Sequence, residues 1–267
     1  MAGFIRYISV QVGRLFTDSH YIVFSIRRRS TDTQADGDVR IYNLSDNNEE
    51  LVTERGLPVV LAAGYLRPQQ NVSEIFRGDV VRFERQRIGN DRVSVVHVGN
   101  EVMRQTSATI ERTYDGRATV HQIINDLVRE LRLSAGSLQD IPNTTLFNYR
   151  VSGPVTDSLR RLLEEERIGL RFYIDGGVVY FTQQGRPSRG PTSRFVISQD
   201  SGMIGTPTVT DDGIRVRTIL ENRIHLGAIF RVVSLGRSLG DYKVVEIEHS
   251  GDNRQGEFVS LIEGRPL

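Results

Sequence analysis

The five histidines are the residues best suited to acid–base or metal chemistry in this chain of 267 residues. They stand at His20, His97, His121, His225 and His249. No two of them have the i, i+3 or i+4 spacing with which adjacent helical turns bind one metal ion. The chain contains no cysteine, which excludes thiolate ligands, thiol nucleophiles and disulfides. We therefore predict no metal site and no cofactor.

The stretch His249-Ser250-Gly251-Asp252 contains the residue types of a hydrolytic triad. A triad needs a histidine held by a carboxylate and a nucleophile presented at a pocket. We interpret this stretch as a polar turn, on which three residues so close in sequence are not expected to achieve that arrangement. Catalysis at His249 is accordingly not predicted.

Four acidic or charged motifs receive structural explanations. Glu164 to Glu166 are adjacent on a predicted helix, where neighbouring side chains point about 100° apart, so we expect an exposed face rather than an acid–base pair. Arg77-Gly78-Asp79 matches an adhesion tripeptide, but the flanking strand patterns favour a turn or bulge at Gly78 and Asp79. Asp211-Asp212 and Asp252-Asn253 have too few oxygen ligands for calcium. No phosphate-binding loop or dinucleotide motif is present, and the chain is not predicted to be an enzyme.

Arginine supplies nearly all of the positive charge, with Lys243 as the single lysine and a net charge of +1. This balance does not indicate a nucleic-acid-binding domain. Arginine pairs with carboxylates while its stem packs on apolar surface, which suits subunit interfaces. The predicted interface residues lie at strand ends. They are Arg27, Arg28, Arg29, Arg82, Arg85 and Arg87.

No membrane segment or signal peptide is predicted. The start of the chain lacks a continuous apolar core, and no run approaches the roughly 20 apolar residues that span a bilayer. We expect the protein to be made and assembled in the cytoplasm.

Alternating apolar and polar residues predict strands on both sides of a more helical middle. The expected strands cover residues 4–12, 21–26, 38–42, 59–65, 74–83 (interrupted by the turn or bulge at 78–79), 79–86, 92–98, 169–174, 178–181, 194–197, 213–219, 229–234, 241–250 and 256–263. A short helix is expected after Ser45, and longer helices over 118–131, with Thr119 as N-cap, and 155–166. Residues 183–192 have the composition of a linker.

These patterns predict a mainly β protein with an α+β insertion. Two antiparallel β-barrel or sandwich domains, residues 1–108 and 190–267, are separated by an α+β unit over residues 109–189. The similar strand-rich pattern on either side of the insertion predicts that the two β-domains are related in structure.

Three segments of the first domain carry a family resemblance. They are Ile41-Tyr-Asn-Leu-Ser45, Val59-Val-Leu-Ala-Ala-Gly-Tyr65 and Ile75-Phe-Arg-Gly-Asp-Val-Val-Arg-Phe83. In this order, with a helix between the first two, they resemble the first tube domain of baseplate central hub proteins from contractile phage tails. Those proteins are related to the hub part of the type VI secretion spike. His249-Ser-Gly-Asp252 and the strand after it resemble, more loosely, the second hub tube domain.

The resemblance implies a structural virion protein of the tail baseplate. A homotrimer with two tube domains in each chain would form a pseudo-hexameric ring, joining a trimeric spike to a hexameric tail tube and initiating tube assembly. The implied partners are the cell-puncturing spike, tube, tape-measure and baseplate wedge proteins, with DNA only passing through the lumen. Two alternatives remain at this stage: a wall-degrading hydrolase, and a carbohydrate- or peptidoglycan-binding module centred on residues 110–185.

Overall fold

The computed structural model describes residues 5–30, 36–67, 70–99, 108–166, 168–175, 177–182 and 195–267. Strands dominate them and form one 13-stranded sheet and two small sheets of two and three strands. The predicted mainly β class is therefore confirmed. The described sheets stay open rather than closing into barrels, because the large sheet runs on from one β region into the other.

The N-terminal β region covers residues 5–99. Its elements are β1 (Ile5–Val12), β2 (Leu15–Thr17), β3 (Ile22–Arg29), β4 (Asp36–Tyr42), α1 (Asp46–Glu50), β5 (Pro58–Arg67), β6 (Ser73–Ile88) and β7 (Asp91–Gly99). In β3 every second side chain is buried, as its alternating sequence predicts. Ser45 is the N-cap of α1, where its Oγ accepts a hydrogen bond from the backbone N–H of Asn48.

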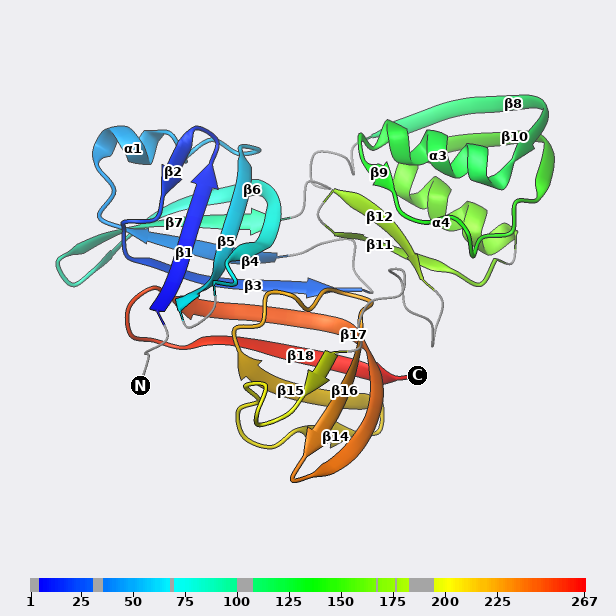
Figure 1. Ribbon diagram of the computed structural model, residues 1–267. Coiled ribbons are helices and arrows are strands. Elements are labelled where there is room, and N and C mark those ends of the chain that lie inside the picture. The colour runs from blue at the N-terminus through cyan, green and yellow to red at the C-terminus, as the bar shows by residue number, and fades with distance from the viewer. Residues whose placement is uncertain are drawn as a thin grey trace.

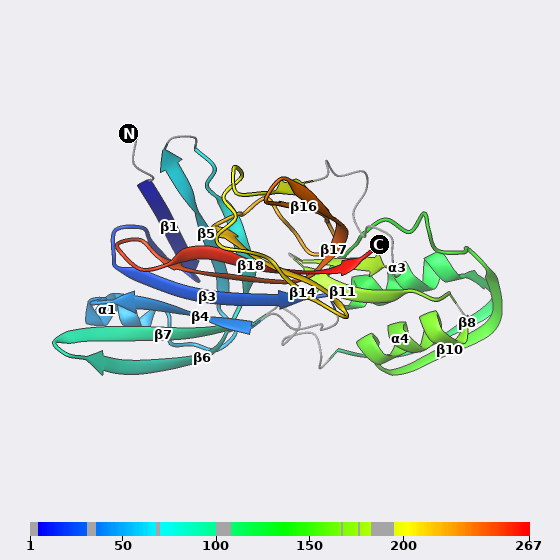
Figure 2. The same cartoon turned by 90° about the horizontal axis from the view of Figure 1, so that it is seen from below.

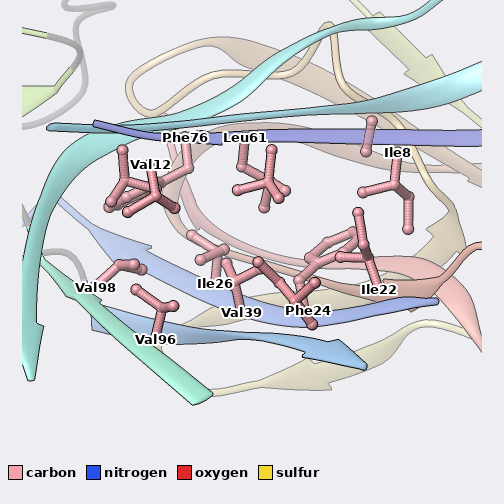
Figure 3. Close-up of a cluster of buried hydrophobic side chains, with 14 of the residues drawn as sticks. Ile8, Val12, Ile22, Phe24, Ile26, Val39, Leu61, Phe76, Val96 and Val98 are labelled. Carbon is pink, nitrogen blue, oxygen red and sulfur yellow. The ribbon is translucent and has the colours of Figure 1, made fainter. Parts of the chain in front are cut away.

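The core of this region lies between two layers of the folded sheet. Figure 3 shows Ile8, Val12 and Leu61 facing Ile26 and Val39 across the interior. β6 reaches both layers, because its first half pairs with β5 and its second half with β7. One long strand therefore joins the two layers of the sandwich.

The insert covers residues 108–182 and has a core of its own. Its elements are β8 (Thr109–Thr119), α3 (Val120–Glu130), β9 (Ser134–Ala135), β10 (Thr145–Pro154), α4 (Val155–Glu165), β11 (Arg171–Asp175) and β12 (Val178–Thr182). The expected helices and the β11–β12 hairpin are present, and Thr119 is the N-cap of α3. The long β8–β10 pair was missed, since its charged, mostly exposed residues carry little periodic signal.

The C-terminal β region covers residues 195–267. Its strands are β13 (Phe195–Ile197), β14 (Thr208–Thr210), β15 (Gly213–Ile219), β16 (Ile229–Ser234), β17 (Arg237–Asp252) and β18 (Phe258–Pro266). The expected strands over 213–219 and 229–234 have the predicted bounds. The division into three domains at about 108 and 190 stays a prediction, because residues 100–107 and 183–194, which include the expected linker, lie outside the described residues.

The two β regions share a strand order. In the first region β5, β6, β7 and β4 lie side by side in that order, and in the second β16, β17, β18 and β15 do so. All of these neighbours are antiparallel. β6 and β17 each have 16 residues, and β7 and β18 each have 9. The order and the lengths both indicate an internal repeat.

The irregularities of pairing recur as well. β6 shifts by one residue against β7 directly after Val80, and β17 shifts against β18 directly after Val244, the eighth residue of each strand. Val80 exchanges backbone hydrogen bonds with Gly56 and Leu57, and Val244 does the same with Gly227 and Ala228. A repeat that preserves bulge positions supports the predicted relation of the two regions, whose superposition stays a prediction.

One pair of strands joins the two β regions. β17 lies antiparallel to β3, with Glu246 opposite Arg29 and Asp252 opposite Val23. Figures 1 and 2 show these strands side by side at the centre of the molecule, with the insert extending to one side. We call this pairing the β17–β3 junction.

The expected turn at Gly78 and Asp79 is absent, because both residues lie inside the continuous strand β6. The irregularities of pairing lie on either side of them, where β5 shifts between Leu61 and Ala62 and where β6 shifts against β7 after Val80. Gly78 does not have a positive φ. A Cβ at this position would lie 2.0 Å from the carbonyl oxygen of Gly99, so close backbone approach excludes a side chain.

Candidate functional site

His249 lies on β17 at the β17–β3 junction and is completely buried. Its Nδ1 is 2.8 Å from Ser260 Oγ, and its Nε2 is 3.3 Å from Arg28 Nη2. A guanidinium can only donate, so Nε2 accepts and the ring proton belongs on Nδ1, which donates to Ser260. Burial, followed by the charge of Arg28 and then His225, lowers the pKa of His249 well below its usual value. The imidazole is therefore a neutral structural link.

The triad is not assembled. Asp252 accepts hydrogen bonds from the backbone N–H groups of Arg254, Gln255 and Gly256 at 2.6–2.7 Å, so its carboxylate organises the loop before β18. The interpretation of this stretch as a polar turn is also wrong, because His249 and Asp252 both lie within β17. The sequence analysis missed the hydroxyl that does contact His249, that of Ser260.

Arg28 connects three parts of the chain. Its Nη1 donates to Asp175 Oδ1 of the insert at 3.0 Å, while its Nη2 meets His249 of the C-terminal region. Both charged side chains of this ion pair are more than 90% buried. The alternation of β3 already placed Arg28 on the apolar face with Phe24 and Ile26, which was the available signal. Arg28 thus makes contacts within its own chain, where the sequence analysis had assigned it to a subunit interface.

Arg27 and Arg29 strengthen the same junction from its more exposed face. Arg27 donates to Glu248 at 2.9 Å, and Arg29 donates to Glu246 at 2.9 Å. Both carboxylates lie on β17, directly across from β3. These two arginines already have partners within the chain, and their role between subunits stays a prediction.

The second predicted arginine group, Arg82, Arg85 and Arg87, lies on the half of β6 from Arg82 to Ile88, which we call the outer half of β6. Arg85 donates to Glu49 of α1 at 2.6 Å, and Arg82 contacts His97 and Glu84 at 3.0 and 3.4 Å. The side chains of Arg82 and Arg85 are each 65% exposed, and Arg87 is exposed as well. This group is accessible, as an interface requires.

The insert is anchored to the C-terminal region by a second set of contacts. Tyr173 is fully buried and donates its hydroxyl hydrogen to the carbonyl oxygen of Leu226 at 3.0 Å. Lys243 contacts the hydroxyl of Thr182, and burial lowers the pKa of Lys243 to about 8. These contacts fix the β11–β12 hairpin in position.

The remaining candidates stay apart from one another. Glu164 and Glu165 are exposed on α4, and Glu165 accepts a hydrogen bond from Tyr149. Asp211 and Asp212 form the exposed turn between β14 and β15. Within the described ranges, no group of three or more His, Cys, Asp or Glu side chains could hold a metal ion. No described helix is long and apolar enough to span a membrane.

A cleft of about 390 Å³ lies between the β14–β15 turn and β17. Its lining includes Arg29, Thr208, Asp212, Glu246 and Arg265, so charges of both signs face it. Glu246 is already paired with Arg29. The cleft therefore adjoins the β17–β3 junction, whose Arg29 and Glu246 line it.

The described residues form an open, mainly β protein in which buried polar groups join the two β regions and the insert. A family model described as "Baseplate hub gp41" matches residues 15–264. The chain belongs to this baseplate hub family and is a structural protein of the phage tail.

Solved structures agree in fold. A tail protein from Neisseria meningitidis MC58 has a TM-score of 0.67 at 11% identity, with 98% of this chain and 96% of that chain covered. The 43 kDa tail protein of prophage MuSo2 from Shewanella oneidensis has a TM-score of 0.65 at 10% identity, with 98% of each chain covered. No curated protein matches the sequence at a significant level.

A third similar structure is the E. coli c3393 protein, described as a component of the type VI secretion system with structural similarity to the T4 tail proteins gp27 and gp5. Its TM-score is 0.60 at 12% identity, with 97% of this chain and 76% of that chain covered. The resemblance stated from the sequence to phage hub and type VI spike proteins is therefore confirmed.

Proposed function

We propose that three copies of this chain form the pseudo-hexameric ring of a tail baseplate, joining a trimeric spike to the hexameric tail tube and initiating tube assembly. The observation that carries the proposal is the internal repeat. Two β units with the same strand order and bulge positions give a trimer six similar units. Such an assembly presents threefold symmetry to one partner and near-sixfold symmetry to another.

The proposed partners are those that the hub family implies. The spike and tube proteins would bind opposite faces of the ring, the tape-measure and wedge proteins would bind around it, and DNA would only pass through the lumen. Assembly would take place in the host cytoplasm before the tail is complete. Among the described residues, nothing favours the hydrolase or the glycan-binding alternative, since His249 and Asp252 hold different structural partners.

The proposal is tested by native mass. Sedimentation of the purified chain, alone and mixed with the spike and tube proteins of the same tail, should give a trimer or a complex that contains three copies. A stable obligate interface of this kind buries roughly 2,000 Å² or more, so the trimer should persist on dilution. A monodisperse monomer that binds neither partner would contradict the proposal.

A further inference from the structure

The outer half of β6 has an open edge. Its hydrogen-bonded neighbour β5 reaches only as far as Asp79, and Val80 bonds to the chain at Gly56 and Leu57. From Arg82 to Ile88 the strand pairs with β7 on one side, and no other described strand pairs with it on the other. An unpaired strand edge is a template for another strand, and proteins usually cover it or use it.

The internal repeat shows what covers the equivalent edge. Aligning Val80 with Val244 places residues 82–88 of β6 on residues 246–252 of β17. In the C-terminal region that half-strand is covered by β3, from Glu246 opposite Arg29 to Asp252 opposite Val23. The β17–β3 junction is therefore the filled counterpart of the open edge on β6.

The repeat also identifies the strand that corresponds to β3. β3 lies next to β4, and β14 lies next to β15, which is the counterpart of β4. β14 is at the end of the described sheet order, and all three of its residues are exposed, with Val209 at 61%. Among the described strands, the outer half of β6 thus offers an open edge, and β14, which pairs with β15 on one side, has a free edge on its other side.

We propose that β14 of one copy of this chain adds antiparallel to the outer half of β6 of the next copy. The register follows from the junction, in which Ser25 pairs with Ser250 and Arg27 with Glu248. In the repeat, β14 corresponds to β3, so Thr208 corresponds to Ser25 and Thr210 corresponds to Arg27. The outer half of β6 corresponds to the end of β17, so Gln86 corresponds to Ser250 and Glu84 corresponds to Glu248. Thr208 therefore lies opposite Gln86, and Thr210 lies opposite Glu84.

Charge supports this pairing. The edge of β6 carries Arg82, Arg85 and Arg87, and β14 leads directly into the exposed carboxylates of Asp211 and Asp212. In the proposed register the acidic turn lies beside the Arg82 end of the edge. The existing junction likewise has ion pairs across its two strands, Arg27 with Glu248 and Arg29 with Glu246. Opposite charges across neighbouring strands stabilise the pairing and disfavour other registers.

The pairing is head-to-tail, because donor and acceptor lie in different β regions. Head-to-tail contacts form a closed ring when the rotation between copies closes, and here each contact repeats one that the chain already makes internally. A β14 of three residues supplies few backbone hydrogen bonds, so we assign it the role of fixing the register within a larger interface. This inference rests on the proposed ring and names the contact that forms it.

The natural absence of cysteine makes the test direct. In the double variant Gln86→Cys/Thr208→Cys, mild oxidation of the full-length protein should give a covalent trimer on a non-reducing gel. Ser25→Cys/Ser250→Cys is the matched control, because the same geometry within one chain should give an internal disulfide at monomer mass. Ile88→Cys/Val209→Cys is three residues out of register, about 10 Å of strand, and should cross-link poorly.

The outcomes separate the inference from the proposed function. Cross-linked trimer in the first variant, with the control disulfide formed, supports the pairing. A native trimer whose Gln86→Cys/Thr208→Cys variant does not cross-link overturns the pairing and leaves the ring intact. A cross-link at monomer mass, or one only to the spike protein, also overturns the pairing. A monomer that binds no partner overturns both.

Discussion

Arg28 and Asp175 are 147 residues apart in sequence, and their charged groups meet at 3.0 Å inside the protein. This ion pair connects the central sheet to the insert, and His249 contacts the same guanidinium from the C-terminal region. Three regions of the chain are therefore connected through one side chain.

Removing one partner of this pair should be costly. We expect Asp175→Ala to lower the free energy of unfolding by about 3 kcal/mol, because it leaves the buried charge of Arg28 uncompensated. The double variant Arg28→Met/Asp175→Leu should recover much of that loss, since the apolar pair buries no charge. Chemical denaturation measures both, and an Asp175→Ala variant as stable as wild type would contradict this account.

His249 should make stability depend on pH. The pKa of His249 is lower in the folded protein than in the unfolded chain, where it is near 6.5. Below about pH 6.5 the unfolded chain therefore binds a proton at His249 that the folded protein does not bind. The contribution of neutral His249 to the free energy of unfolding is complete above about pH 6.5. As the pH falls below that value, the free energy of unfolding decreases by at most about 1.4 kcal/mol for each pH unit.

The control for that effect is a change of residue type. His249→Gln keeps a carbonyl oxygen that can accept from Arg28 but cannot be protonated, so most of the slope between pH 6.5 and 5 should disappear. The partly exposed His97 provides the comparison, and His97→Gln should retain the slope. If both variants show the same dependence of unfolding free energy on pH as wild type, a group other than His249 binds the proton.

Gly78 should tolerate no side chain. Gly78→Ala places a methyl group 2.0 Å from the carbonyl oxygen of Gly99, and we expect a loss of roughly 3 kcal/mol or misassembly. Gly116→Ala is the comparison, because Gly116 has a φ of +76° but open space around it, so only about 1 kcal/mol should be lost. Thermal unfolding and soluble yield would rank the variants, and the reverse ranking would show that contact is not the constraint.

The two β regions should superpose in an experimental structure. We expect β5, β6, β7 and β4 to overlay β16, β17, β18 and β15, with Val80 on Val244 and Gly56 on Gly227. The reason is that bulges and strand-entry glycines at matched positions restrict the backbone in the same way. Cryo-electron microscopy of the assembled tail would check this overlay, and unrelated paths for the two strand sets would contradict the repeat.

The sequence predicted those strands that have one buried face and one more exposed face. In β3 and β16 one face is buried and the other partly exposed, so period-2 patterns specify them. β8 and β10 lack that contrast and were missed. Alternation placed Arg28 on the buried face, but Asp175 and His249 come together only through the tertiary fold. No local pattern could have paired them.

The β17–β3 junction also affects how the chain folds during synthesis. Arg27 and its partner Glu248 are 221 residues apart, so at about 5–20 residues per second β3 emerges roughly 10–45 s before the strand that covers it. During this interval its edge is exposed to other nascent chains on the same polysome. The charged ends at Arg27 and Arg29 lower the tendency of that edge to aggregate, because charged side chains on an exposed strand disfavour pairing with a wrong partner.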